Sequence, residues 1–299
     1  MDRIIQCIPN FSEGRRPEVV REIVNAITKA SGVRVVDYSM DVDHNRSVVT
    51  FIGEPEDVRR SAVAGARAAV GLIDLNRHVG EHPRIGAIDV LPVVPIEGVT
   101  MDEAVALSHK IGADIARQLL LPVYFYENSA RDASRTNLAD IRRGGFEALK
   151  HRALEGDRLP DAGPARAHAT AGAVVVGARG PLVAFNVNLA TDDVAVARAI
   201  AARIRAVRDS GEAMPGVKAI GVYLKSRNLA QVSMNITQPD KVSMQAVYSF
   251  VEAEARAAGV ETLESELIGA IRCESQMGGS CASMKMGELA RARIIESWV

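Results

Sequence analysis

Apolar residues along the first half of the chain occur in two alternating patterns. Short runs rich in β-branched residues are typical of buried strands, and longer segments with apolar residues on one helical face are typical of amphipathic helices. The predicted strands cover residues 3–8, 33–38, 47–53, 87–95 and 122–126. The predicted helices cover residues 17–30, a segment from residue 55 and residues 101–118, with two polar helical segments before residue 152. Thr100 and Glu103 predict a capping box at the start of the third of these helices.

The second half repeats this order of elements. Its predicted strands cover residues 173–176, 182–188, 217–224, 231–236 and 261–267. One helix follows the second of these strands and another covers residues 242–257, so that the order is β-α-β-β-α-β with one extra strand, as in ferredoxin-like units. We therefore predict an α/β (α+β) protein with two ferredoxin-like βαββαβ-type subdomains, each with helices on one face of its sheet, and a ligand groove between them.

The segment EGDRLPDAGPARAHATA at residues 155–171 interrupts the pattern. It is rich in Gly, Pro, Ala and charged residues and has no period, which is typical of a loop or linker. We therefore predict an N-terminal subdomain at residues 1–172 and a C-terminal subdomain at residues 173–299. The tail at residues 272–299 is irregular, and its pattern suggests no role.

The chain has 299 residues, with 36 basic and 37 acidic side chains and a net charge of −1. No apolar run reaches the roughly 20 residues that span a bilayer, and the N-terminus becomes polar too early for a signal peptide. No block of like charge indicates a nucleic-acid or membrane surface. We therefore expect a cytoplasmic protein that binds neither, in which a local arginine cluster holds any anionic substrate.

The segment GEHPRIGAIDV at residues 80–90 is the strongest candidate for chemistry. It holds Glu81, His82 and Arg84 together between two glycines, directly before a predicted strand. Histidine can exchange protons near neutral pH, and arginine can bind a carboxylate by a bidentate pair. A surface turn with a solvated histidine explains the same residues, so the pattern alone leaves both interpretations open.

Three further loops carry polar residues. DVDHNR at residues 41–46 would supply metal ligands if Asp41, Asp43 and His44 converged with His82, but a polar turn explains it more simply. The loop at residues 9–15 leads into a helix N-terminus, where free N–H groups favour anions. The glycines of GPARAHATAG at residues 163–172 let the backbone approach a flat ligand, although a linker has the same composition.

Together these segments resemble the formiminotransferase family, the N-terminal half of the bifunctional formiminotransferase–cyclodeaminases. GEHPRIGAIDV and NFSEGR are the most specific motifs, and the resemblance covers roughly residues 3–270. The matching stretches are CIPNFSEGR at 7–15, DHNRSVVTFIG at 43–53, LIDLNRHVGEHPRIGAIDV at 72–90, TAGAVVVGARGPLVAFNVNL at 170–189 and LAQVSMNIT at 229–237.

The resemblance implies an activity of histidine degradation and one-carbon metabolism. The enzyme would transfer the formimino group from N-formimino-L-glutamate to N5 of tetrahydrofolate, its co-substrate, without a metal, and give 5-formiminotetrahydrofolate and glutamate. The family's catalytic acid–base histidine corresponds to His82, and family members are usually homodimers. The chain ends before the cyclodeaminase domain would begin, so we expect no deaminase activity.

The acid–base mechanism adds candidate residues to those that the resemblance implies. We expect Asn10, Arg46 and Arg84 to bind substrate or folate, and Glu81 or Asp41 to orient the His82 ring. The family's folate-contacting loop falls on Gly163, Pro164, Ala165, Arg166, Ala167, His168, Ala169, Thr170, Ala171 and Gly172.

This chain departs from the family pattern in that loop. Ala162 stands where relatives have phenylalanine, and Ala169 stands where they have proline, so we expect weaker packing against the pterin. Two alternatives follow: a folate-binding paralogue that acts on another one-carbon group, and a non-catalytic ligand-binding protein. A hydrolase with a metal bound by the Asp41 segment and His82 is a third.

Overall fold

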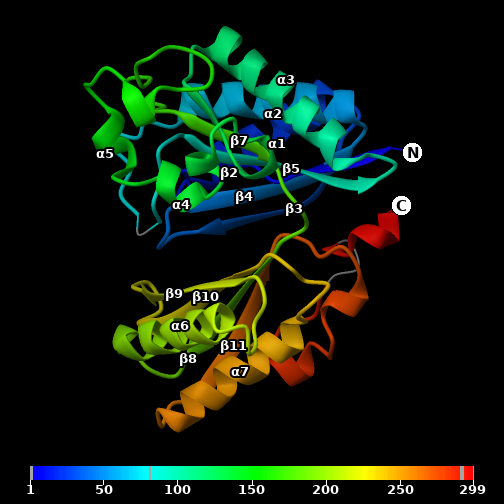
Figure 1. Ribbon diagram of the computed structural model, residues 1–299, viewed down its shortest axis with the longest axis vertical. Helices are drawn as coiled ribbons and strands as arrows, with labels where there is room; N and C mark the ends of the chain where they lie inside the picture. Colours follow the sequence, from blue (N-terminus) through cyan, green and yellow to red (C-terminus); the bar gives the residue numbers. More distant parts are fainter. Residues whose placement is uncertain (1–2, 81, 290–292, 299) are drawn as a thin grey trace. The chain divides into compact units, whose positions relative to one another are not determined.

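The computed structural model describes residues 3–80, 82–289 and 293–298 of the chain (Figure 1). The chain forms two compact units, Met1–Gly180 and Pro181–Val299. No helix in these described ranges is long and apolar enough to cross a membrane. The predicted α/β class with two βαββαβ-type units is confirmed.

The first unit contains a seven-stranded sheet. Its strands are β1 (Ile4–Cys7), β2 (Asn10–Phe11), β3 (Arg34–Asp41), β4 (Arg46–Gly53), β5 (Ile88–Glu97), β6 (Val123–Phe125) and β7 (Val174–Ala178). β3 pairs with β4, and β4 pairs with β1 and β2, which in turn pair with β5. These pairs are antiparallel and give the ferredoxin-like order, to which β7 and β6 are added by parallel pairing.

β1 and β2 form one interrupted strand between β4 and β5. Pro9 separates them, and proline has no N–H for a regular ladder. The carbonyl of Pro9 still accepts from Val49 N at 3.1 Å, and Ile8 N donates to the carbonyl of Pro92 at 3.1 Å. The sequence predicted only the first half of this strand. The interruption places Asn10 at the start of the loop that leads into the first helix.

Three helices cover one face of this sheet, as the pattern predicted. They are α1 (Pro17–Ala30), α2 (Pro55–Leu72) and α3 (Met101–Leu119), and α2 and α3 lie above the sheet in Figure 1. Pro17 and Pro55 begin their helices, and the predicted capping box of Thr100 with Glu103 starts α3. The fully buried Val49 and Phe51 of β4 point into the core beneath these helices.

The segment that follows β6 covers part of the opposite face. It contains the short helices α4 (Leu138–Ile141) and α5 (Gly145–Leu149). Leu149 and Leu154 are buried against Val90 of β5 and Val175 of β7. This second core fixes the segment at residues 138–172 to the same strands that carry the candidate site.

The second unit contains a four-stranded antiparallel sheet in the order β11-β8-β10-β9. Its elements are β8 (Val183–Leu189), α6 (Val194–Asp209), β9 (Val217–Leu224), β10 (Leu229–Ile236), α7 (Met244–Ala257) and β11 (Thr262–Ile268). This is the ferredoxin-like arrangement. The helices pack on one face of the sheet, as Figure 1 shows, around the buried Phe185, Val232 and Ile204.

The division between the units falls after Gly180 rather than after residue 172. The strand that the sequence assigned to the second half is β7, and it pairs with β5 and β6 of the first sheet. The segment at residues 155–171 is therefore not a linker. Buried strands with runs of valine look alike in either sheet, so the pattern alone could not assign β7 to its partner strands.

The tail packs onto the second unit. Met277, Met284 and Ile294 belong to its hydrophobic core, and Ser265 Oγ donates to the carbonyl of Met284 at 2.6 Å. Its short 3₁₀ turns are Glu274–Gln276, Ala282–Met284 and Ile295–Trp298. The tail that suggested no role in the sequence therefore has a structural one.

Candidate active site

His82 lies in the loop between α2 and β5 of the first unit. Its Nδ1 lies 2.7 Å from the carbonyl of Pro83, which can only accept, so Nδ1 carries the proton. Nε2 is then the basic nitrogen of the neutral ring, and Nη1 of Arg46 donates to it. The ring is therefore fixed in one tautomer with its lone pair toward an arginine.

Arg46 begins β4 and connects His82 to the opening loop. Its Nη2 donates to Oδ1 of Asn10, while Nδ2 of Asn10 donates to the carbonyl of Ile8 at 2.7 Å. Side chains alternate along a strand, and Val49 points toward the helices, so Arg46 points to the other face of the sheet. Three predicted site residues, Asn10, Arg46 and His82, thus meet there.

Asn45 connects its own turn to the opening loop and to the His82 loop by hydrogen bonds. Its Oδ1 accepts from Gly14 N at 2.9 Å, its Nδ2 donates to the carbonyl of Val79 at 3.1 Å, and its own carbonyl accepts from Nε2 of His78 at 2.7 Å. Asn45 has a φ of 47° at the end of the β3–β4 turn, a conformation that asparagine tolerates. The sequence interpretation missed this role, although Asn45 lies inside the DVDHNR motif.

Arg84 is engaged with protein groups. Its guanidinium makes a bidentate pair with Glu147 at 3.0 and 2.8 Å, and its Nε donates to Nδ1 of His78 at 2.9 Å. The Arg84 side chain is 14% exposed. Arg84 therefore joins the His82 loop to α5, and its expected contact with a substrate carboxylate would require Glu147 to give way.

Of the two carboxylates that were expected to orient the His82 ring, the structure describes only Asp41. Asp41 accepts from the backbone N–H of His44 at 2.7 Å, and its other oxygen lies 3.9 Å from Nε2 of His44. Asp41 therefore contacts His44 and not His82. Glu81 lies outside the described residues. The group that holds Nδ1 of His82 is the Pro83 carbonyl, which no side-chain pattern would reveal.

Charges around His82 favour its neutral form. Burial lowers the pKa of His82 well below 6.5, and the positive charges of Arg46 and Arg142 lower it further. Arg142, which follows α4, pairs with the buried Asp89 of β5, and Asp89 also accepts from Ile85 N at 2.9 Å. Arg142 lies in one of the polar helical segments predicted before residue 152, and no sequence motif marked it as a functional residue.

The predicted folate loop is tied to the segment that follows His82. Ala87 N donates to the carbonyl of Ala171 at 2.9 Å, and Leu75 N donates to that of Thr170 at 2.8 Å. His168 closes the turn, since its backbone pairs with that of Gly172 at 2.8 and 3.0 Å. The end of this loop and the His82 loop are therefore adjacent within one unit.

Two glycines permit this approach. Gly172 has a φ of 69°, and a Cβ there would lie 2.1 Å from the carbonyl oxygen of Ile85. A Cβ on Gly86 would lie 1.8 Å from the carbonyl oxygen of Ala173. Ser12 completes the junction by donating from Oγ to the carbonyl of Gly86 at 2.7 Å. The opening loop therefore packs against the same point.

Ala162 was expected to lie beside the pterin, but the structure places it against the hydrophobic core of the first unit. Its side chain packs against the core beneath the helices, and its backbone pairs with Val123. Ala169 is exposed, and its carbonyl accepts from Nδ2 of Asn76 at 2.9 Å. The side chain at position 162 therefore bears on core packing.

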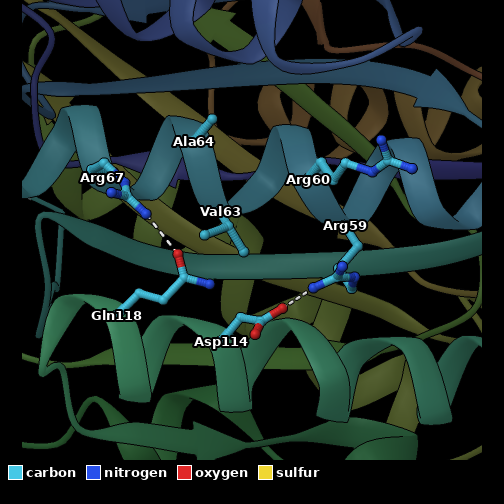
Figure 2. Close-up of a pocket in the computed structure, with 7 residues that line it drawn as sticks. All are labelled: Arg59, Arg60, Val63, Ala64, Arg67, Asp114 and Gln118. Carbon is cyan, nitrogen blue, oxygen red and sulfur yellow. Dashed lines mark hydrogen bonds and ion pairs between the residues drawn. The ribbon is translucent and has the colours of Figure 1, made fainter.

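A hollow of about 330 Å³ lies elsewhere, between α2 and α3 (Figure 2). Its arginines already have partners: Arg59 contacts Asp114, and Arg67 donates to Gln118 at 2.6 Å. It is remote from the His82 loop in the fold and contains none of the predicted site residues. Within the described ranges, no three His, Cys, Asp or Glu side chains gather as metal ligands would.

Comparisons with known proteins agree with the motifs. Residues 4–179 match the family described as the formiminotransferase domain, N-terminal subdomain, and residues 184–284 match the formiminotransferase domain. A glutamate formimidoyltransferase from Streptococcus pyogenes serotype M1 is 44% identical over 90% of this chain and 89% of its own length. One from Thermoplasma acidophilum is 40% identical over 90% and 88%.

A bifunctional relative matches most of this chain, but the match spans only half of the relative's own length. The formimidoyltransferase-cyclodeaminase of Sus scrofa is 40% identical over 91% of this chain but only 50% of its own length. The two family matches together cover most of the chain and divide it close to the boundary between its two compact units. This chain belongs to the formiminotransferase family.

Proposed function

We propose that this enzyme transfers the formimino group of N-formimino-L-glutamate to N5 of tetrahydrofolate and releases glutamate. Its membership of the family and its similarity to two glutamate formimidoyltransferases support this reaction. The observation that carries the proposal is His82, a half-buried neutral ring with a fixed tautomer, adjacent to the loop expected to contact folate.

His82 would act as both base and acid. N5 must lose a proton as it attacks the formimino carbon, and the α-amino nitrogen of glutamate must gain one as it leaves. Nε2 of His82 is the basic atom, so once Arg46 Nη1 moves from it to the substrate, Nε2 can take the first proton and deliver it to the leaving nitrogen. The Pro83 carbonyl stabilises the ring when Nε2 gains its proton, because Nδ1 keeps its hydrogen bond throughout.

Arg46 and the loop at residues 163–172 would hold the substrates. Arg46 contacts both His82 and Asn10, so an anion bound to its guanidinium would lie beside the base. The exposed Gly163, Ala165 and Ala169 offer backbone to the flat pterin ring. Arg84 holds the His82 loop in place through Glu147 and would contact substrate only if that pair opens.

A turnover assay with both substrates tests the reaction. Wild type, His82→Ala and the control His151→Asn, which changes an exposed histidine, would be followed by appearance of 5-formiminotetrahydrofolate. We expect His82→Ala to lower kcat by roughly 10²–10⁴-fold, the usual contribution of acid–base catalysis, while the control keeps its rate. Near-normal turnover by His82→Ala would contradict the role of His82.

The same assay separates the alternatives. Folate binding without turnover in the wild type would indicate a paralogue with another one-carbon donor. Ligand binding that is indifferent to His82→Ala, without turnover of any donor, would indicate a binding protein. We also propose that the chain is a cytoplasmic homodimer, as the family resemblance implies; sedimentation at micromolar concentration tests the dimer, and a single monomeric species would contradict it.

A further inference from the structure

Three buried nitrogen atoms around His82 have no hydrogen-bond partner among the residues that the structure describes. They are Nε of Arg46, Nε of Arg142 and Nδ1 of His44. Buried N–H groups of arginine almost always have an acceptor, since arginine has five donors and loses water at each one on burial. Three such atoms near one reactive histidine indicate that an acceptor from outside the chain completes the group.

The charged groups around His82 also indicate that an anion binds there. Arg142 is neutralised by Asp89, and Asp41 accepts from the His44 backbone. Arg46 forms no ion pair with any carboxylate of the described residues, and burial lowers its pKa to about 9. A desolvated guanidinium without a carboxylate in direct contact is unfavourable, so a bound anion would stabilise Arg46.

The rings of His44 and His82 limit what the anion can be. Their centroids are 5.9 Å apart in an edge-to-face arrangement, so His44 lies directly beside the His82 ring. Nε of a guanidinium, together with one of its Nη atoms, presents a planar pair of donors that matches a carboxylate. The ligand must also carry a nitrogen that His82 can protonate, if the proposed reaction is correct.

We propose that Arg46, Arg142 and His44 bind the α-carboxylate of the formimino donor. The inference rests on the proposed function, because that carboxylate is attached to the carbon that bears the leaving nitrogen. Arg46 already donates to Nε2 of His82, so a carboxylate on its Nε side brings the leaving nitrogen within reach of the same ring. The pocket therefore selects donors in which the formimino nitrogen and a carboxylate share one carbon.

Binding would also prepare His82 for catalysis. The charges of Arg46 and Arg142 lower the pKa of His82 in the empty enzyme. The negative charge of a bound carboxylate opposes this effect, so the pKa of His82 rises when the donor is present. The histidine thus becomes able to hold the transferred proton only after the donor has been bound.

Donors with and without the α-carboxylate test the pocket. N-formimino-L-glutamate would be compared with the N-formimino derivative of 4-aminobutyrate, which keeps the chain and the distal carboxylate. The variants are Arg142→Gln, Arg142→Lys, which retains a charge for Asp89 but lacks Nε, and the control Arg143→Gln, whose side chain is 78% exposed. Thermal unfolding would confirm that each variant is folded.

We expect both Arg142 variants to lower kcat/KM for the glutamate donor by about 10- to 100-fold, the usual effect of a charged hydrogen bond. With Arg142→Lys, which keeps the charge that acts on His82, the 4-aminobutyrate donor should lose less than about 3-fold, because it makes no contact that this substitution removes. Arg143→Gln should leave both donors unchanged. Equal losses with the two donors, or no loss with either, would overturn the proposal.

A binding experiment keeps this proposal separate from the proposed reaction. Titration calorimetry would compare L-glutamate with 4-aminobutyrate on wild type and Arg142→Lys, without any turnover. Preference for L-glutamate that Arg142→Lys abolishes would support the pocket even in a chain that transfers no formimino group. Normal turnover of formiminoglutamate with no dependence on Arg142 would sustain the reaction and refute the pocket.

Discussion

At the scale of single residues, burial determines the behaviour of the two histidines beside Arg46 and Arg84. Burial lowers the pKa of His82 well below 6.5 and is also the largest cause of the lowered pKa of His78. Each ring also accepts a hydrogen bond from an arginine, His82 from Arg46 and His78 from Arg84, and a second proton on the ring would disturb that bond. The unfolded chain therefore binds more protons than the folded one as pH falls below about 6.5.

The sign of the resulting pH dependence follows from linkage. Stability rises with pH wherever the unfolded state binds more protons, so the contribution of His82 is present above pH 6.5 and is lost as pH falls toward its folded pKa. Urea unfolding at pH 7, 6 and 5 should show a shallower loss for His82→Gln than for wild type. Parallel losses in the two proteins would contradict the lowered pKa.

Asn45 is predicted to be a structural centre of the site. Asn45→Ala removes two side-chain hydrogen bonds and leaves alanine at a φ of 47°, so we expect a loss of about 2–3 kcal/mol in the free energy of unfolding. Asn228→Ala is the matched control, with a φ of 52° and one bond to Tyr223 in an exposed turn. A loss at Asn45 no larger than the control's would contradict the role.

Individual residues divide into those that the sequence revealed and those that it could not. His82, Arg46 and Asn10 lie in recognisable motifs and meet in the structure. Arg142 does not, because its position depends on how the segment after β6 folds back over the sheet to Asp89. The sequence identified the segment that carries Arg84, but it could not reveal the partner Glu147, because that contact depends on the same tertiary fold.

At the scale of elements, the loop that ends at Gly172 fits against the His82 loop only without a side chain. Gly172→Ala would place a Cβ 2.1 Å from the carbonyl of Ile85 at a φ of 69°. We expect a loss of about 2–4 kcal/mol in the free energy of unfolding and a raised KM for the folate, because the loop must shift. Unfolding curves and KM values measure both.

The control for this substitution is Gly71→Ala. Gly71 lies near the end of α2, and a Cβ there meets nothing within 4 Å. Alanine is the better helix former, so this variant should gain about 0.4–1 kcal/mol in stability and keep its KM. Equal effects of the two substitutions would show that the space at Gly172 does not matter.

Helices with a strong hydrophobic period could be predicted from the sequence, whereas strands that are defined by their pairing with other strands could not. The helices from Pro17 and Pro55 and the capping box at Thr100 follow local rules and appear as predicted. β2 has only two residues and exists because β4 and β5 flank it on both sides. β7 was assigned to the wrong half, since strand pairing over long range is not encoded in the pattern of one strand.

At the scale of the whole molecule, each unit has a core of its own. Phe51 and Ile111 belong to the core beneath the helices of the first unit, whereas Phe185 and Tyr248 belong to that of the second. We therefore expect residues 1–180 and 181–299 to fold when expressed separately. Circular dichroism and cooperative thermal unfolding of each part test this, and a molten or aggregated fragment would contradict it.

The second unit uses the same scaffold with its charges arranged differently. Asn228 ends the β9–β10 turn with a positive φ, as Asn45 ends the β3–β4 turn. The neighbouring Arg227 pairs with both Glu264 and Glu266, whereas Arg46 has a histidine and an amide as partners. Two copies of one scaffold in the same chain can therefore differ in reactivity through the partners of a single arginine at the same turn.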